Sequence, residues 1–385
     1  MGRTMKVLTI GSVLALALSA SAAASTPEIT QVVGGLNSPR GVEVGADGTV
    51  YVVEAGTGGT LGCGDTAELG KLCFGPSGAI VSVAGGVATP VVEGLTSGAT
   101  DTGEVVGPSD LAIGEDGTIW FLIGGPGGGE SAAFRDGVPD GAAAAIGQLY
   151  KVGEDGTPVA VADLAAYETA NNPDAQQPGN TDPDSNANGL AVGMEGAAIA
   201  DAGANSLLLV APDGTITVGA VFPVVFQPAP PDPAASPGPG ASPMMIPMDP
   251  TPTSVVMGPD GALYVGQLTG FPFPVGGASV FRVVPGEEPT VYASGFTNVM
   301  DIEFAADGTL YVLEIAHDSL LTAGPDGPPP GGLWKVPAGG GTPELVTAEG
   351  LPMPGGLGIA ADGTIYVSTC AACPAGAGGL VSLKP

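Results

Sequence analysis

Apolar and polar residues alternate along most of this chain in short segments, which an acidic residue followed by glycine interrupts. Six copies of one pattern recur, each with an apolar segment, a two-residue turn and a second segment that usually bears an aromatic residue. The copies are SPRGVEVGADGTVYVVE (38–54), GPSDLAIGEDGTIWFLI (107–123), NANGLAVGMEGAAIAD (186–201, degenerate), TPTSVVMGPDGALYVGQ (251–267), NVMDIEFAADGTLYVLE (298–314) and MPGGLGIAADGTIYVST (353–369). Asp-Gly between alternating apolar runs predicts β-hairpins with type I′ turns, which have positive φ at both central residues.

Further strands are predicted after each hairpin. The third strands fall at 78–83, 147–152, 205–210, 278–283, 331–336 and 378–383. Fourth strands follow in five copies and run to Leu95, Leu164, Phe222, Phe296 and Leu351. The last copy lacks a fourth strand, and the segment 28–36 is expected to supply it. This pattern predicts an all-β fold, a six-bladed β-propeller with four-stranded blades whose last blade is closed by the N-terminal strand.

The chain is divided into an export signal and one domain. Arg3 and Lys6 precede an apolar run at 7–18 and small residues that end near Ala24. Residues 1–24 are therefore interpreted as a signal peptide, because the apolar run is shorter than the roughly 20 residues of a membrane span. Residues 25–385 form the propeller domain, in which 223–252 is a Pro-rich insertion between blades three and four. We expect a secreted protein, extracellular or periplasmic, without a membrane span.

Composition restricts the chemistry. Gly and Pro make up about 27% of the chain, a share typical of disorder unless the sequence is periodic. Nine Lys and Arg stand against 39 Asp and Glu, which gives a formal charge of -30. Nucleic acid and anionic membranes are excluded as expected partners, since both require clustered cations. A single His excludes a metal centre built from several imidazoles.

The four cysteines are expected to form disulfides in an exported protein. Cys63 and Cys73 share one loop, and Cys370 and Cys373 form a CxxC. Pairing within each loop is favoured. Pairing between the loops, a redox CxxC and a four-Cys zinc site stay open as alternatives.

Several stretches of the chain resemble one known family. LNSPRGVEVGADGTVYVVEAG, ADLAAYETANNPD, YVGQLTGFPFPVGGASVFRV and LYVLEIAHDSLL are similar to the ScyD/ScyE family, secreted propellers that are associated with scytonemin biosynthesis. The resemblance implies a six-bladed propeller related to the NHL, gluconolactonase and strictosidine-synthase-like groups. It implies no defined activity. Gln267 departs from it, because a Glu is expected there.

Alignment of the copies brings polar residues to the face opposite the turns. The expected ligand-binding residues are Arg40, Glu54, Asp110, Asn188, Asp201, Gln267, Asp301 and Glu314. Asp110 and Asp301 are expected to face each other across the central channel. With Glu54 and Glu314 they form a candidate Ca²⁺ site, because Ca²⁺ takes six to eight oxygen ligands. In the alternative interpretation, Asp110 and Asp301 accept backbone N–H bonds where one blade passes to the next.

His317 follows Glu314 by three residues, and the pair is the candidate acid/base group. A structural hydrogen bond is the alternative for this histidine. The segment 184–195 matches the spacing of an EF-hand loop, but the repeat makes half of it a strand, so we reject that interpretation. GGPGGGE (124–130) has no Lys, and no helix is expected after it.

Two loops on the same face carry further candidate groups. Asn171, Asn172, Asp174, Asp182, Asp184 and Asn186 form an oxygen-rich cluster for Ca²⁺ or for Asx turns. FPFP (271–274) offers aromatic and proline surface for an apolar ligand or a lid contact.

The leading hypothesis for function is a secreted module that binds a small molecule or a protein partner on this face, with structural Ca²⁺ as a candidate ion. The alternative is a metal-assisted hydrolase, lactonase or lyase that uses the carboxylates with His317 as acid/base. A third interpretation is an acidic envelope or matrix protein. Propeller folds host both binding modules and enzymes, so the fold does not decide between those two.

Overall fold

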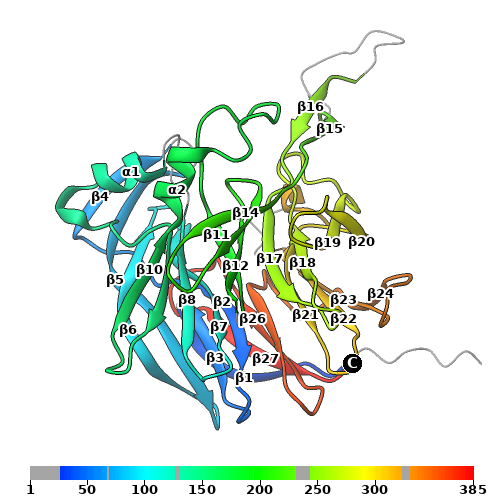
Figure 1. Cartoon of the computed structure of the whole chain (residues 1–385). Coiled ribbons are helices and arrows are strands. Elements are labelled where there is room, and N and C mark those ends of the chain that lie inside the picture. Colours follow the sequence, from blue (N-terminus) through cyan, green and yellow to red (C-terminus); the bar gives the residue numbers. More distant parts are fainter. Residues whose placement is uncertain (1–26, 67–68, 126–130, 194, 231–242, 323–328) are drawn as a thin grey trace, which may run out of the picture.

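The computed structural model is an all-β structure with two short α-helices, and it describes residues 27–66, 69–125, 131–193, 195–230, 243–322 and 329–385 (Figure 1). The expected signal peptide lies outside the described residues. Among the described residues, no helix has the length and apolar character needed to cross a membrane.

The strands group into antiparallel units of four, which we number in chain order. Units one to three contain β2 (Pro39–Val44), β3 (Val50–Glu54), β5 (Gly70–Ala84) and β6 (Val87–Ala99); β7 (Val105–Ile113), β8 (Ile119–Gly124), β9 (Gln148–Val152) and β10 (Pro158–Asp163); and β11 (Ala187–Gly193), β12 (Gly196–Asp201), β13 (Ser206–Val210) and β14 (Ile216–Val221).

The C-terminal half of the chain continues the same arrangement. Units four to six contain β17 (Pro252–Met257), β18 (Leu263–Gln267), β19 (Ala278–Val283) and β20 (Thr290–Phe296); β21 (Val299–Phe304), β22 (Leu310–Glu314), β23 (Gly332–Val336) and β24 (Glu344–Thr347); and β25 (Gly356–Ile359), β26 (Ile365–Thr369), β27 (Gly378–Leu383) and β1 (Thr30–Leu36). The predicted third strands and the predicted pairing of 28–36 with 378–383 are confirmed.

The first strands of successive units contact one another, and β25 contacts β2 in turn. The apolar core lies between neighbouring units. For example, Val42 and Val52 of unit one pack with Leu380 of unit six in one buried cluster. Each unit thus buries its apolar side chains against the next, which is how a four-stranded sheet with short edges becomes stable.

The turns differ from the prediction. Gly48 has φ 83°, but Asp47 does not have positive φ. The Gly48 N–H donates to the Gly45 carbonyl (2.7 Å) and the Gly45 N–H to the Thr49 carbonyl (2.8 Å). This is a type I turn followed by a left-handed glycine, not the predicted type I′ turn. The Asp47 side chain accepts the Thr49 N–H (2.9 Å), and the aspartates of the other four Asp-Gly turns accept the equivalent N–H, which explains the aspartate before these turn glycines.

Several elements were not predicted. In unit one, β5 and β6 extend beyond the repeat, and β6 pairs with β7 of unit two through Gly98 and Val106. The strand β4 (Gly62–Thr66) pairs with β5 beside the Cys63–Cys73 disulfide, and Cys370 lies within disulfide distance of Cys373. The favoured local pairing of the cysteines is therefore confirmed.

Helices also appear where none was expected. α1 (Ser131–Gly137) follows the glycine-rich segment 124–130, so the expectation that no helix follows it was wrong. α2 (Leu164–Asn171) replaces the last residue of a predicted fourth strand, and 3₁₀ turns span Pro139–Gly141 and Leu320–Thr322. In the Pro-rich insertion, β15 (Val225–Pro228) pairs with β16 (Met245–Met248). Figure 1 shows α1, α2 and this hairpin at one end of the molecule.

Candidate functional site

The carboxylates that end the second strands serve as caps within their own units. Glu54 accepts the backbone N–H of Asn37 at 2.6 Å. Asp201 does the same for Asn186 (2.7 Å), and Glu314 does it for Thr297 (2.6 Å). All three side chains are buried, and burial raises the pKa of each. These hydrogen bonds fix the entry of the chain into the first strand of the unit.

Asp110 and Asp301 link neighbouring units. Asp110 of β7 accepts the Leu190 N–H of unit three at 2.7 Å, and Asp301 of β21 accepts the Leu357 N–H of unit six at 2.8 Å. The second oxygen of each carboxylate accepts the N–H of the residue that follows it. Both carboxylates therefore make the inter-blade bonds that the alternative interpretation describes.

Asp110 and Asp301 also belong to a larger group with Glu43 and Glu303, which we call the axial carboxylates. Burial raises the pKa of Asp301 to about 7 and that of Glu43 to about 7, the latter with a contribution from the charge of Asp301. The pKa values of Asp110 and Glu303 lie well above the ordinary range, first because of burial and then because of neighbouring axial carboxylates. Sequence reasoning missed Glu43 and Glu303. The available signal was the two-residue spacing of Asp301 and Glu303, which places both side chains on one face of a strand.

Other predicted ligand residues also bridge units. The Arg40 guanidinium donates to the Val105 carbonyl at 2.5 Å, and burial lowers its pKa to about 10. The Asn188 amide donates to the Thr253 carbonyl at 2.8 Å. Gln267 is buried at the end of β18. Among the described residues, no three His, Cys, Asp or Glu side chains are arranged to hold a metal ion. The calcium site stays a prediction.

The Glu314–His317 pair is formed as predicted. The His317 Nδ1 lies 2.5 Å from Glu314 Oε2, and the imidazole ring centre is 5.9 Å from that of Trp334. The Glu314 side chain is fully buried, while that of His317 is 24% exposed. A buried carboxylate thus orients a partly accessible imidazole, an arrangement that suits acid/base chemistry.

A cavity lies elsewhere, at the end of units three and four that is opposite the Asp-Gly turns. It has a volume of about 530 Å³. One wall comes from the segment between α2 and β11, and the other comes from the β18–β19 loop. Asp249 also contributes to the lining. We call it the acidic cavity, and its charged and aromatic lining residues are Asp174, Asp182, Asp184, Asp249, Phe271 and Phe273. The predicted oxygen-rich cluster and the FPFP segment both contribute to its lining. Because these segments are far apart in the sequence, their proximity was not predicted.

The polar wall of the acidic cavity is held in place by amide side chains. Asp174 is 3% exposed and accepts bonds from Asn180 (2.6 Å) and Asn205 (2.8 Å). Burial nevertheless raises its pKa, and the charge of Asp249 adds to this shift. Thr269 also lines the cavity. It is fully buried, and its Oγ1 has no hydrogen-bond partner among the described residues.

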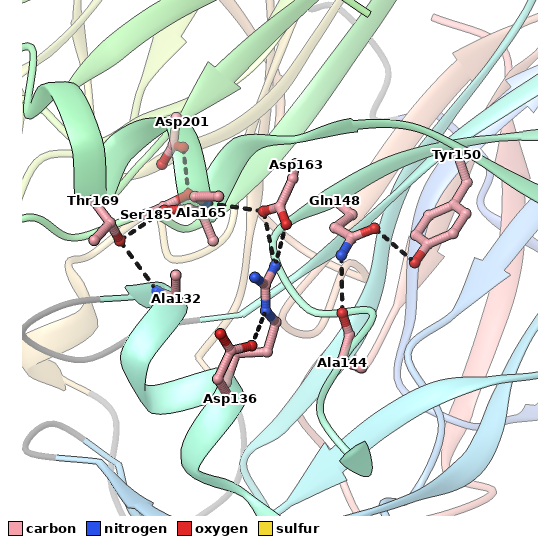
Figure 2. A network of polar contacts seen from close by, with 12 residues as sticks. Ala132, Asp136, Ala144, Gln148, Tyr150, Asp163, Ala165, Thr169, Ser185 and Asp201 are labelled. Carbon is pink, nitrogen blue, oxygen red and sulfur yellow. Dashed lines mark hydrogen bonds and ion pairs between the residues drawn. The ribbon is translucent and has the colours of Figure 1, made fainter.

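A polar network anchors the helix that leads into this wall (Figure 2). Asp163 caps α2 by accepting the Ala166 N–H (2.9 Å), and it binds Arg135 of α1 at 2.8 and 2.9 Å. Glu168 of α2 is fully buried. Burial raises its pKa to about 8, and the charge of Asp201 makes the second largest contribution.

The sequence matches no family model and no curated protein. Solved structures show similarity of fold. A glucose dehydrogenase is 13% identical, with 93% of this chain and 100% of that chain covered and a TM-score of 0.52. A protein of unknown function from Bacteroides thetaiotaomicron VPI-5482 is 10% identical, with 93% and 76% covered and a TM-score of 0.52. A streptogramin B lyase is 13% identical, with 93% and 97% covered and a TM-score of 0.49.

The two similarities with TM-scores of 0.52, together with the antiparallel four-stranded sheets, place the chain in the β-propeller class. At such identities they show the fold alone.

Proposed function

We propose that this chain is an exported six-bladed propeller of the ScyD/ScyE type that binds a small molecule in the acidic cavity. The ring of contacts among six first strands supports six blades. The observation that carries the proposed function is the cavity itself, which is lined by four aspartates and two phenylalanines.

The lining favours a ligand with a positively charged nitrogen and an apolar portion. No Lys, Arg or His lies among the described residues that line the cavity, so its charged lining residues are all acidic. An ammonium group would donate charge-assisted hydrogen bonds to carboxylates at the polar wall. The rings of Phe271 and Phe273 lie 6.3 Å apart at right angles, and they offer apolar surface and a face for a cation.

The test compares two ligands of similar shape and opposite charge. Calorimetric titration is expected to show binding of phenethylamine and none of phenylacetate. Asp249→Asn and Asp182→Asn should each weaken amine binding about tenfold, because a charge-assisted hydrogen bond contributes about 1.5 kcal/mol or more. Equal binding of the two ligands would contradict the proposal.

Asp213→Asn provides the matched control. Asp213 is an exposed turn residue whose carboxylate accepts the Thr215 N–H, and it does not line the acidic cavity. Like the two cavity variants, Asp213→Asn removes one negative charge. Its affinity for phenethylamine should therefore equal that of the unaltered protein, whereas a general electrostatic attraction to the acidic chain would weaken binding in all three variants.

A second candidate function, hydrolysis or lyase chemistry, is favoured by one observation, the 2.5 Å contact between His317 and Glu314. In that case the imidazole acts as acid/base and Glu314 orients it. His317→Ala should abolish turnover across a panel of lactones and esters. Unchanged turnover in this variant would remove the histidine from the mechanism.

A further inference from the structure

A second cavity lies at the opposite end of units three and four, beside the Asp-Gly turns. Its volume is about 540 Å³. Its lining is mostly apolar and comes from both units, and it includes Ala191, Ala198, Leu209, Met257, Leu263 and Pro285. We call it the inter-unit cavity.

The repeat explains why this cavity exists. In five units the second residue of the second strand carries an aromatic ring, and in each of them it pairs with the same position of the first strand. These residues are Tyr51, Trp120, Tyr264, Tyr311 and Tyr366. In unit three the equivalent residue is Ala198, which pairs with Ala191. The degenerate third copy therefore lacks one ring.

The missing ring would have packed against the next unit. In unit four, the ring of Tyr264 contacts Phe304 of unit five, with ring centres 4.9 Å apart in an edge-to-face arrangement. Phe304 lies three residues before the turn aspartate Asp307, and the equivalent residue of unit four is Met257. Ala198 and Met257 both line the inter-unit cavity, and Met257 is 48% exposed. The space between them is the space that an aromatic ring fills at the next interface.

We propose that the inter-unit cavity binds a small neutral molecule with one aromatic ring, which takes the place of the absent side chain. An apolar cavity of about 150 Å³ is sufficient to bind benzene. The threonines Thr215 and Thr217 also line the cavity and supply hydroxyl groups, which suit a phenol. Glu195 is the only charged residue among the described residues of the lining, so a carboxylic acid is disfavoured.

The experiment uses p-cresol, which reproduces the tyrosine side chain, and follows its binding by ligand-observed NMR and calorimetry. The unaltered protein is expected to bind one equivalent. Ala198→Tyr should weaken binding at least about tenfold and raise the melting temperature by about 1–3 °C, because the new ring fills the cavity. Absence of binding to the unaltered protein, or equal binding to Ala198→Tyr, would overturn the proposal.

Met257→Phe fills the cavity from its exposed wall, and it keeps the test decisive if Ala198→Tyr does not fold. It should also weaken p-cresol binding, and unchanged affinity would count against the proposal.

Tyr264→Ala is the converse variant, since it opens the equivalent space between units four and five. It should bind a second equivalent of p-cresol, and one equivalent only would contradict the assignment to the ring position. Phenethylamine binding in the acidic cavity should be unaffected by Ala198→Tyr, so the two proposals can fail separately.

Discussion

Asp301 and Asp307 belong to the same hairpin of unit five, yet their carboxyl groups behave in opposite ways. Asp307 is exposed in the turn, accepts the Thr309 N–H at 2.9 Å, and has a lowered pKa because of this hydrogen bond. Asp301 accepts two backbone N–H groups at 2.8 Å, but burial raises its pKa to about 7. Asp110 and Asp116 repeat this contrast in unit two. Backbone hydrogen bonds favour the charged form in both places, and desolvation outweighs them at Asp110 and Asp301.

The largest effect is expected from Asp301→Ala. The Ile302 and Leu357 N–H groups would lose their acceptor in a buried site, which costs about 2–4 kcal/mol of the free energy of unfolding. Urea denaturation measures this loss. A loss no greater than that of Asp307→Ala would show that burial does not distinguish the two aspartates.

The pH dependence of stability is expected to be the next largest effect. A carboxyl group whose folded-state pKa exceeds its unfolded value binds more protons when folded between the two values. Asp301 and Glu43 therefore make the protein less stable as the pH rises from about 4 to about 7, and the melting temperature should fall by on the order of 5 °C between pH 5 and pH 8. The turn aspartates act in the opposite sense and lose their contribution only below about pH 4. A melting temperature that rises from pH 5 to pH 8 would contradict the shifts.

Glu43→Gln tests which carboxylates produce that slope. The amide keeps the shape and removes one ionisable group from the axial carboxylates, so the difference in melting temperature between pH 5 and pH 8 should shrink by about a third. Asp116→Asn removes one exposed charge and should leave the difference unchanged. Equal effects of the two variants would attribute the slope to net charge.

Asp307→Ala is expected to give the smallest effect. It removes the acceptor of one exposed N–H, which water can replace, so the loss should be about 0.5–1 kcal/mol in urea denaturation. A loss above that of Asp301→Ala would mean that turn formation, not the channel, limits stability.

The repeat predicted the strands well because side chains alternate with a period of two and each unit reuses the same positions. Gly48 has positive φ as predicted, but the residue before it does not, since the aspartate side chain stabilises a type I turn instead. α2 was missed because Asp163 belongs to the last strand of its unit and also caps the helix. The sequence predicted only part of the acidic cavity, because Asp249 and Thr269 reach it from segments far from Asp174 in the sequence.

The pairing of β1 with β27 has a consequence for the order of events during synthesis. Thr30 lies opposite Ser382, so nearly the whole described chain separates the two partners, whereas the other strand pairs within units join nearby segments. Closing so long a loop costs more entropy than closing a hairpin, and contacts of this range form late. Because synthesis proceeds from the N-terminus, β1 stays unpaired until residue 382 has been added to the chain. Residues 378–383, which are made long after β1, are thus the ones that complete its sheet, and any pause before them leaves an open sheet edge.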